Sequence, residues 1–153
     1  MESLQAAREE LKRADHLLYV SLKYTRTVDV LKSLIERLIN CIDLVIESLL
    51  KRAKEKKNIK EIPTNQGLRL ELVKKVYHSD EKILHIMAFY TTLRKISRAE
   101  YKRTNEYRRH VTMIATTDEG VINIDLDIIK EHYEKTVEFT DYVDDMLYPK
   151  EQQ

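Results

Sequence analysis

The sequence has little of what usually interrupts or cross-links a small protein. Its 153 residues include two glycines, two prolines, one cysteine and no tryptophan. A single cysteine, Cys41, excludes an internal disulfide, and its place in an apolar helical repeat predicts a buried thiol rather than a nucleophile. Gly67 and Gly120 alone cannot build a glycine-rich phosphate-binding loop. With so few residues that break helices, the composition favours a helical fold.

No segment has the composition of a membrane-spanning helix or a signal peptide. The apolar run from Ile42 to Leu50 is interrupted by Asp43 and Glu47, and the N-terminus leads into a charged segment. We therefore expect no membrane association, with cytoplasmic localisation as the default. The 27 basic and 26 acidic residues give a net charge of +1, so any affinity for polyanions must come from local clustering. The high charge content is compatible with a thermophilic source.

The strongest helical pattern lies between Val28 and Leu49. Strict three- and four-residue spacing is kept by Val28, Leu31, Ile35, Leu38, Ile42, Val45 and Leu49. A second set, consisting of Leu34, Cys41, Leu44 and Ile46, widens the apolar surface beyond one stripe. This breadth predicts a central helix that contacts neighbours on more than one side. It also makes a homodimer, joined through the first two helices, the expected oligomeric state.

Four further helices are predicted from the same periodicity. The first spans about 3–21, and a shorter one has Leu68, Leu72, Val73 and Val76 inward, after a loop at 58–67. Ser79-Asp80-Glu81 then has the character of a helix N-cap with an acidic first turn, before an apolar stripe from Ile83 to Ile96. A final helix begins near Asp125 or Asp127 and runs to about Leu147.

The pattern changes after His110. β-branched residues fill 111–116 and 121–124 and flank Thr117-Asp118-Glu119-Gly120, where Gly120 suits a positive φ at the end of a turn. This composition predicts a small β-hairpin near residues 111–124. The whole chain, residues 1–153, is therefore expected to form one domain that is mainly α, a bundle of about five helices with this hairpin attached.

The segment from Arg94 to His110 is locally basic and invites a functional interpretation. Its basic residues are Arg94, Lys95, Arg98, Lys102, Arg103, Arg108, Arg109 and His110, with Tyr101 and Tyr107 interleaved and only Glu100 and Glu106 in opposition. Guanidinium groups bind phosphates in a bidentate way and tyrosines stack on unpaired bases, so the mixture suits single-stranded RNA or a nucleotide. The alternative is a solvated helical face in which Glu106 pairs with its basic neighbours.

Within this segment Arg103 and His110 are seven positions apart. In a helix that spacing returns nearly to the same face, about 10 Å further along the axis. This pair, together with the helical architecture, resembles the HEPN (higher eukaryote and prokaryote nucleotide-binding) superfamily of compact helical bundles. Many members carry an Arg followed a few residues later by a His, which in active members resembles a metal-independent ribonuclease site, often formed by two subunits. The resemblance implies that Arg103 stabilises phosphate charge and that His110 moves a proton.

The remaining histidines and carboxylates form no recognisable ligand pattern. The sequence contains no His-Glu-x-x-His or Cys-x-x-Cys motif, and Asp141, Asp144 and Asp145 lack the alternating spacing of a calcium loop. We expect neither a metal nor a cofactor. The leading hypothesis is a helical interaction module for protein or RNA association, in which the segment 94–110 binds RNA or a nucleotide. A metal-independent ribonuclease that uses Arg103 and His110 is the alternative.

Overall fold

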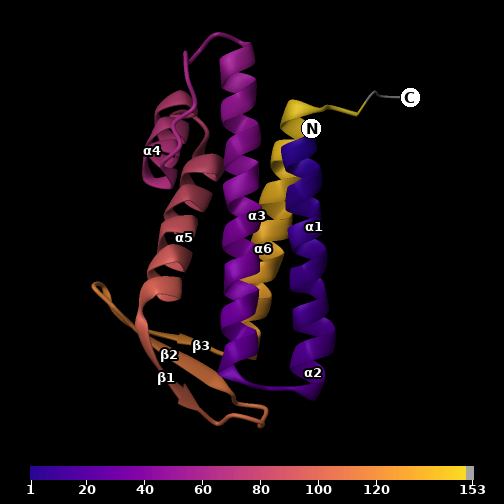
Figure 1. Ribbon diagram of the computed structural model, residues 1–153, viewed down its shortest axis with the longest axis vertical. Helices are drawn as coiled ribbons and strands as arrows, with labels where there is room; N and C mark the ends of the chain where they lie inside the picture. The colour runs from indigo at the N-terminus through magenta and orange to yellow at the C-terminus, as the bar shows by residue number, and fades with distance from the viewer. Residues whose placement is uncertain (151–153) are drawn as a thin grey trace.

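Helices make up most of the protein, as the computed structural model shows for residues 1–150, the part of the chain that it describes (Figure 1). In chain order the elements are α1 (Glu2–His16), the π-helical turn η1 (Leu17–Ser21), α2 (Leu22–Tyr24), α3 (Val28–Glu55), α4 (Gln66–Val76), α5 (Glu81–Arg98), β1 (Glu100–Thr104), β2 (Thr112–Thr117), β3 (Gly120–Ile124) and α6 (Leu126–Leu147). The predicted class, mainly α with a small hairpin, is confirmed.

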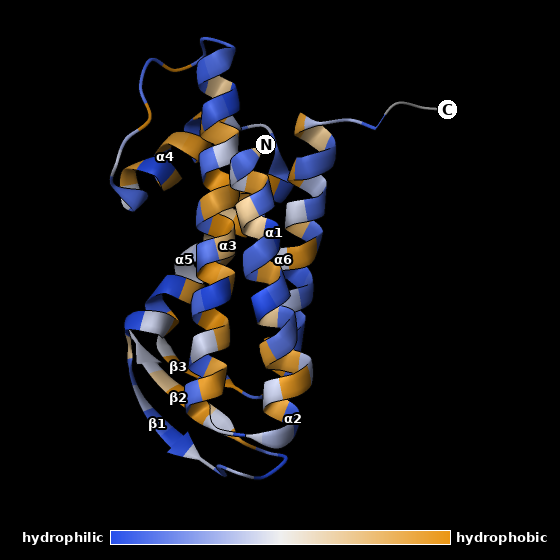
Figure 2. Ribbon diagram, turned by 45° about the vertical axis from the view of Figure 1, so that its right-hand side comes forward, coloured by the Kyte–Doolittle hydropathy of each residue, from blue (hydrophilic) through white to orange (hydrophobic). Residues whose placement is uncertain are grey.

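The central helix is α3, and the chain's own elements cover it. It contacts α1, α4, α5, α6 and β2, with α1 and α6 on one side and α4 and α5 on the other (Figures 1 and 2). All of its strictly spaced apolar residues are fully buried, as are Leu34, Cys41 and Ile46 of the second set. Because this broad apolar surface is satisfied within one chain, it no longer gives a reason to expect a homodimer.

Side-chain caps fix where the other helices begin. Asp80 accepts a hydrogen bond from the Ile83 amide at 3.0 Å, and Asp125 accepts one from the Ile128 amide at 2.9 Å, so both predicted starts are confirmed. The predicted inward face of α4 is partly wrong. Leu68 is 60% exposed, and Leu70 is buried in its place, because α4 lies at the periphery and covers α3 with a narrow stripe.

A three-stranded antiparallel sheet closes the end of the bundle at which α3 begins (Figure 1). The predicted hairpin is formed by β2 and β3, with Met113 opposite Ile124 and Gly120, at φ 119°, in the turn. Strand β1 was not predicted, and it pairs with β2 so that Tyr101 lies opposite Ala115. Met113, Ala115 and Ile124 are buried against the helices. The basic segment therefore leaves the helical state at Arg98.

Replacing Leu38 by Ala should lower the free energy of unfolding by roughly 2–5 kcal/mol, because this side chain is fully buried halfway along α3. Urea unfolding followed by circular dichroism measures the change. Ser33→Ala, at an exposed position of the same helix, is the control and should shift the value by less than about 0.5 kcal/mol. Equal unfolding midpoints for Leu38→Ala and the unmodified chain would contradict the central placement of this helix.

Candidate nucleic-acid interface

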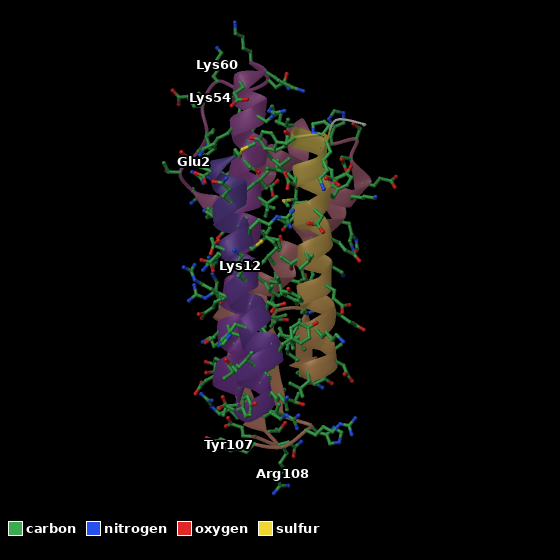
Figure 3. The ribbon with its side chains drawn as sticks, turned by 90° about the vertical axis from the view of Figure 1, so that its right-hand side faces the viewer. Glu2, Lys12, Lys54, Lys60, Tyr107 and Arg108 are labelled. Atoms are coloured by element: carbon green, nitrogen blue, oxygen red, sulfur yellow. The ribbon has the colours of Figure 1, made fainter. Side chains whose placement is uncertain are left out.

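The predicted basic segment is divided among three structural elements. Arg94 and Arg98 lie on α5, Tyr101, Lys102 and Arg103 lie on β1, and Tyr107, Arg108, Arg109 and His110 lie in the loop between β1 and β2. These residues therefore do not share one helical face. The loop residues lie at the extremity of the molecule, where Figure 3 labels Tyr107 and Arg108. Arg94 lies one turn before the end of α5, and Arg98 is the last residue of that helix.

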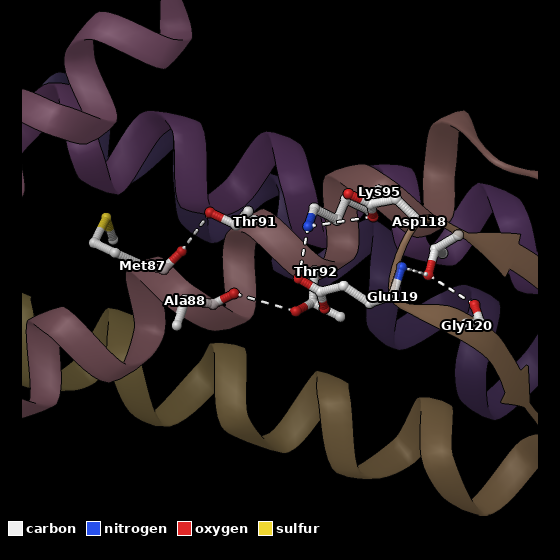
Figure 4. A network of polar contacts seen from close by, with 9 residues as sticks. Met87, Ala88, Thr91, Thr92, Lys95, Asp118, Glu119 and Gly120 are labelled. Carbon is white, nitrogen blue, oxygen red and sulfur yellow. Dashed lines mark hydrogen bonds and ion pairs between the residues drawn. The ribbon is translucent and has the colours of Figure 1, made fainter.

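Two of the predicted basic side chains on α5 are engaged by the protein itself. Lys95 contacts Glu119 at 2.7 Å and Asp118 at 3.4 Å, both in the turn between β2 and β3 (Figure 4). Arg94 lies over the ring of Tyr90, with 5.6 Å between the guanidinium carbon and the ring centroid. The Tyr90 hydroxyl in turn donates to Asp43. The Lys95 ion pairs hold α5 to the sheet, and the Tyr90 hydrogen bond holds it to α3, so the charge of Lys95 is already matched by carboxylates.

The helical alignment of Arg103 with His110 is wrong, because Arg103 lies in β1 and His110 lies in the following loop. The Arg103 guanidinium contacts Asp29 at 2.8 Å and the Tyr101 hydroxyl at 3.2 Å. The hydrogen bond with Asp29 raises the pKa of Arg103 above its ordinary value. Its charge is thus matched by a carboxylate at the start of α3, which weakens the basis for a role on substrate phosphate.

The loop after β1 is fastened to the turn that precedes α3. The Glu106 carboxylate accepts a hydrogen bond from the Val28 amide at 3.2 Å, and the Tyr107 amide donates to the Arg26 carbonyl at 2.7 Å. Asn105 and Tyr107 adopt positive φ angles of 54° and 63°, which are uncommon for residues other than glycine. Glu106 therefore lies at the first turn of α3, where a negative charge is stabilising, and the same carboxylate is 3.8 Å from the Arg103 guanidinium.

This attachment creates a surface that we call the basic tip, defined by Lys23, Tyr24, Arg26, Tyr107, Arg108, Arg109 and His110. Tyr24 is 78% exposed and Tyr107 is 77% exposed. Within the described part of the chain, no carboxylate forms an ion pair with the basic residues of the tip. Sequence reasoning missed Lys23, Tyr24 and Arg26, since only the folded chain brings them to the loop. The sequence pattern that could have indicated them is an aromatic residue, Tyr24, between the cations Lys23 and Arg26 at the end of a helix.

Among the cavities of the described chain, one adjoins the predicted basic residues and another lies between α5 and α6. A polar cavity of about 160 Å³ adjoins the tip and is lined by Arg109, His110, Thr112, Asp125, Leu126 and Asp127. An open groove of about 390 Å³ lies between α5 and α6 and is lined by Glu81, Lys82, His85, Ile86, Lys135, Glu138, Phe139 and Tyr142. The groove carries two lysines and two glutamates over an apolar floor, so its charges balance and favour no ionic ligand.

His132 lies beside this groove, packed edge-on against Phe89 with 5.0 Å between the ring centroids. Burial, followed by the positive charge of Lys135, lowers the pKa of His132 from 6.5 to about 4. The histidine is therefore a neutral packing residue.

Comparison with known proteins found no matching family model, no matching curated protein and no matching solved structure. Residues 1–150 contain no helix that combines the length and apolarity needed to cross a membrane. In the same range, no three side chains among His, Cys, Asp and Glu gather as a metal site would require. The tip and its neighbouring cavity are therefore the features of the molecule that bear on its function.

The free energy of unfolding should fall as the pH drops from about 6.5 to about 4 through the contribution of His132. The unfolded chain takes up a proton in this window while the buried imidazole excludes it, so the contribution is complete above 6.5 and is lost on acidification. Urea unfolding at several pH values, compared between the unmodified chain and His132→Gln, isolates this slope. His85→Gln, at an exposed position on α5, is the control. Identical pH slopes for the unmodified chain and His132→Gln would contradict the assignment.

Proposed function

We propose that this protein binds single-stranded RNA through the basic tip. The observation that carries the proposal is the pair of exposed tyrosines, Tyr24 and Tyr107, on two segments joined by the Tyr107 to Arg26 hydrogen bond. Aromatic rings stack on unpaired bases for about 1–3 kcal/mol per base, with little dependence on sequence. Cations on both sides of the rings supply attraction to the phosphates of the same strand.

The chemistry of the tip favours single strands over duplexes. Bases within a duplex are already stacked on one another, so exposed tyrosine rings gain contacts mainly with unpaired bases. The cations of the tip are few, and the whole chain carries a net charge of only +1. Electrostatic attraction is therefore local, and affinity should fall with salt by a slope of about 0.7 for each phosphate contacted.

Other predicted binding residues have a smaller part in this proposal. Arg94, Lys95 and Arg103 are occupied by Tyr90, by the turn carboxylates and by Asp29 respectively. Arg98 and Lys102 are exposed on α5 and β1, outside the tip, and add positive potential near it. The ribonuclease interpretation remains a prediction, and no contact of Arg103 favours it. Gel analysis of the RNA after each binding measurement detects cleavage directly.

Replacing Tyr24 and Tyr107 together by Ala should weaken binding to a short single-stranded RNA about tenfold or more, because two stacking surfaces are lost. Replacing Arg108 and Arg109 together should weaken binding and reduce the salt slope by about 1.4, which corresponds to two lost phosphate contacts. Fluorescence anisotropy at low salt, repeated over a salt series, measures both effects.

The matched control is Lys54→Ala with Lys60→Ala, which removes the same charge from exposed positions at the opposite end of the molecule (Figure 3). This control should change affinity little and leave the salt slope intact, since both lysines lie about the length of α3 away from the tip. Circular dichroism verifies that each variant folds. Absence of RNA binding by the unmodified chain at low salt, or equal losses in the tip and control variants, would refute the proposal.

A further inference from the structure

The polar cavity beside the basic tip is bounded by two elements of opposite charge. Arg109 and His110 approach it from the loop, and Asp125 and Asp127 approach it from the start of α6. Its volume of about 160 Å³ equals that of about five liquid water molecules, which suits a sugar ring better than a whole nucleotide. The loop side is anchored by the Thr112 hydroxyl, which donates to the His110 carbonyl at 2.9 Å.

Opposite charges share this cavity without neutralising one another. Among the residues that the structure describes, no ion pair within 4.0 Å joins Arg109 or His110 to Asp125 or Asp127. Asp125 uses Oδ1 to accept from the Ile128 amide, so its carboxylate is oriented by the helix that it caps. The cavity therefore presents a cationic side and a carboxylate side, held apart by different elements. A ligand that satisfies both sides needs an anionic group and hydroxyl donors a few bonds apart.

We propose that this cavity binds a ribose that carries a 5′-phosphate and an unblocked 2′,3′-diol, the chemistry of the 3′-terminal nucleotide of an RNA. The inference rests on the proposed binding of RNA by the basic tip. Arg109 binds the phosphate in a bidentate way, and Asp127, with the second oxygen of Asp125, accepts hydrogen bonds from the diol. Carboxylates commonly receive ribose hydroxyls in nucleotide sites. The base remains outside the cavity, on the side of the exposed tip.

The two carboxylates determine how the nucleotide is oriented in the cavity and which RNA 3′ ends the cavity accepts. A phosphate placed beside Asp125 and Asp127 would meet two like charges, so a strand that ends in a 3′-phosphate is disfavoured. A 2′,3′-dideoxy end removes both hydroxyl donors and leaves the carboxylates without their partners. A free nucleoside monophosphate has the same phosphate and diol as an RNA end, and the experiment distinguishes these two sources.

The test uses the full chain and one octanucleotide RNA, labelled at its 5′ end, in three forms: with a 3′-terminal diol, with a 2′,3′-dideoxy end and with a 3′-phosphate. Fluorescence anisotropy should show that the diol form binds about tenfold more tightly than either of the others. Asp127→Asn should abolish this preference, because the dideoxy form then binds as tightly as the diol form, with an affinity equal to or above that of the unmodified chain for the dideoxy form. Asp125→Asn, which preserves helix capping, should reduce the preference. Glu131→Gln, the loss of one exposed charge elsewhere on α6, should retain it.

Unlabelled adenosine monophosphate is the second probe, used as a competitor and by direct calorimetry. Binding of the nucleotide to the unmodified chain but not to Asp127→Asn supports the diol site. Displacement of the diol RNA by millimolar nucleotide shows that the RNA end and the free nucleotide enter the same cavity. Equal affinity for all three RNA forms, with no binding of the nucleotide, overturns the diol site but leaves RNA binding by the tip intact. If the nucleotide binds but no form of the RNA does, the cavity is a nucleotide site and the proposed RNA binding by the tip is refuted.

Discussion

Burial of α3 is the constraint on which the other elements depend. A helix of 28 residues is about 42 Å long, and the apolar surface of this one is wider than a single stripe. No single neighbour can cover such a surface, so α1, α6, α5 and α4 are arranged around it and β2 covers the remaining end. The distribution of fully buried side chains along the whole of α3 shows that this requirement is met within one chain.

The position of the sheet follows from that requirement, and the position of the basic tip follows from the sheet. Met113 and Ala115 cover the beginning of α3, which brings the loop between β1 and β2 against the turn before the helix. Glu106 and the Tyr107 amide then bond to groups that are 78 and 81 residues away in sequence. The chemistry at this end is thus a consequence of core packing, although none of the tip residues belongs to the core.

Sequence periodicity was sufficient for the long helices, since residues such as Leu38 and Leu93 repeat at spacings that only one face of a helix can satisfy. The helix starts at Ser79-Asp80-Glu81 and near Asp125 or Asp127 were recognisable because capping depends on neighbours three residues away. Strand β1 was not recognisable, because Glu100–Thr104 is charged and becomes a strand only by pairing with β2. The carboxylates that pair with Lys95 and Arg103 could not be predicted for the same reason, because they lie far away in the sequence. The contribution of Tyr24 to the tip was missed on the same ground. Each of these features is a contact between distant residues.

The two ends of the described chain lie together. The Met1 amino group donates to the Tyr148 hydroxyl at 2.8 Å, at the end of the bundle opposite the sheet (Figure 1). A short linker could therefore join them, and new ends opened in the polar connection between α3 and α4 would give a circularly permuted protein with the same core. For the same reason, a molecule attached beside Met1 or Tyr148 lies at one end of the bundle and leaves the opposite end, with Tyr24 and Tyr107, exposed.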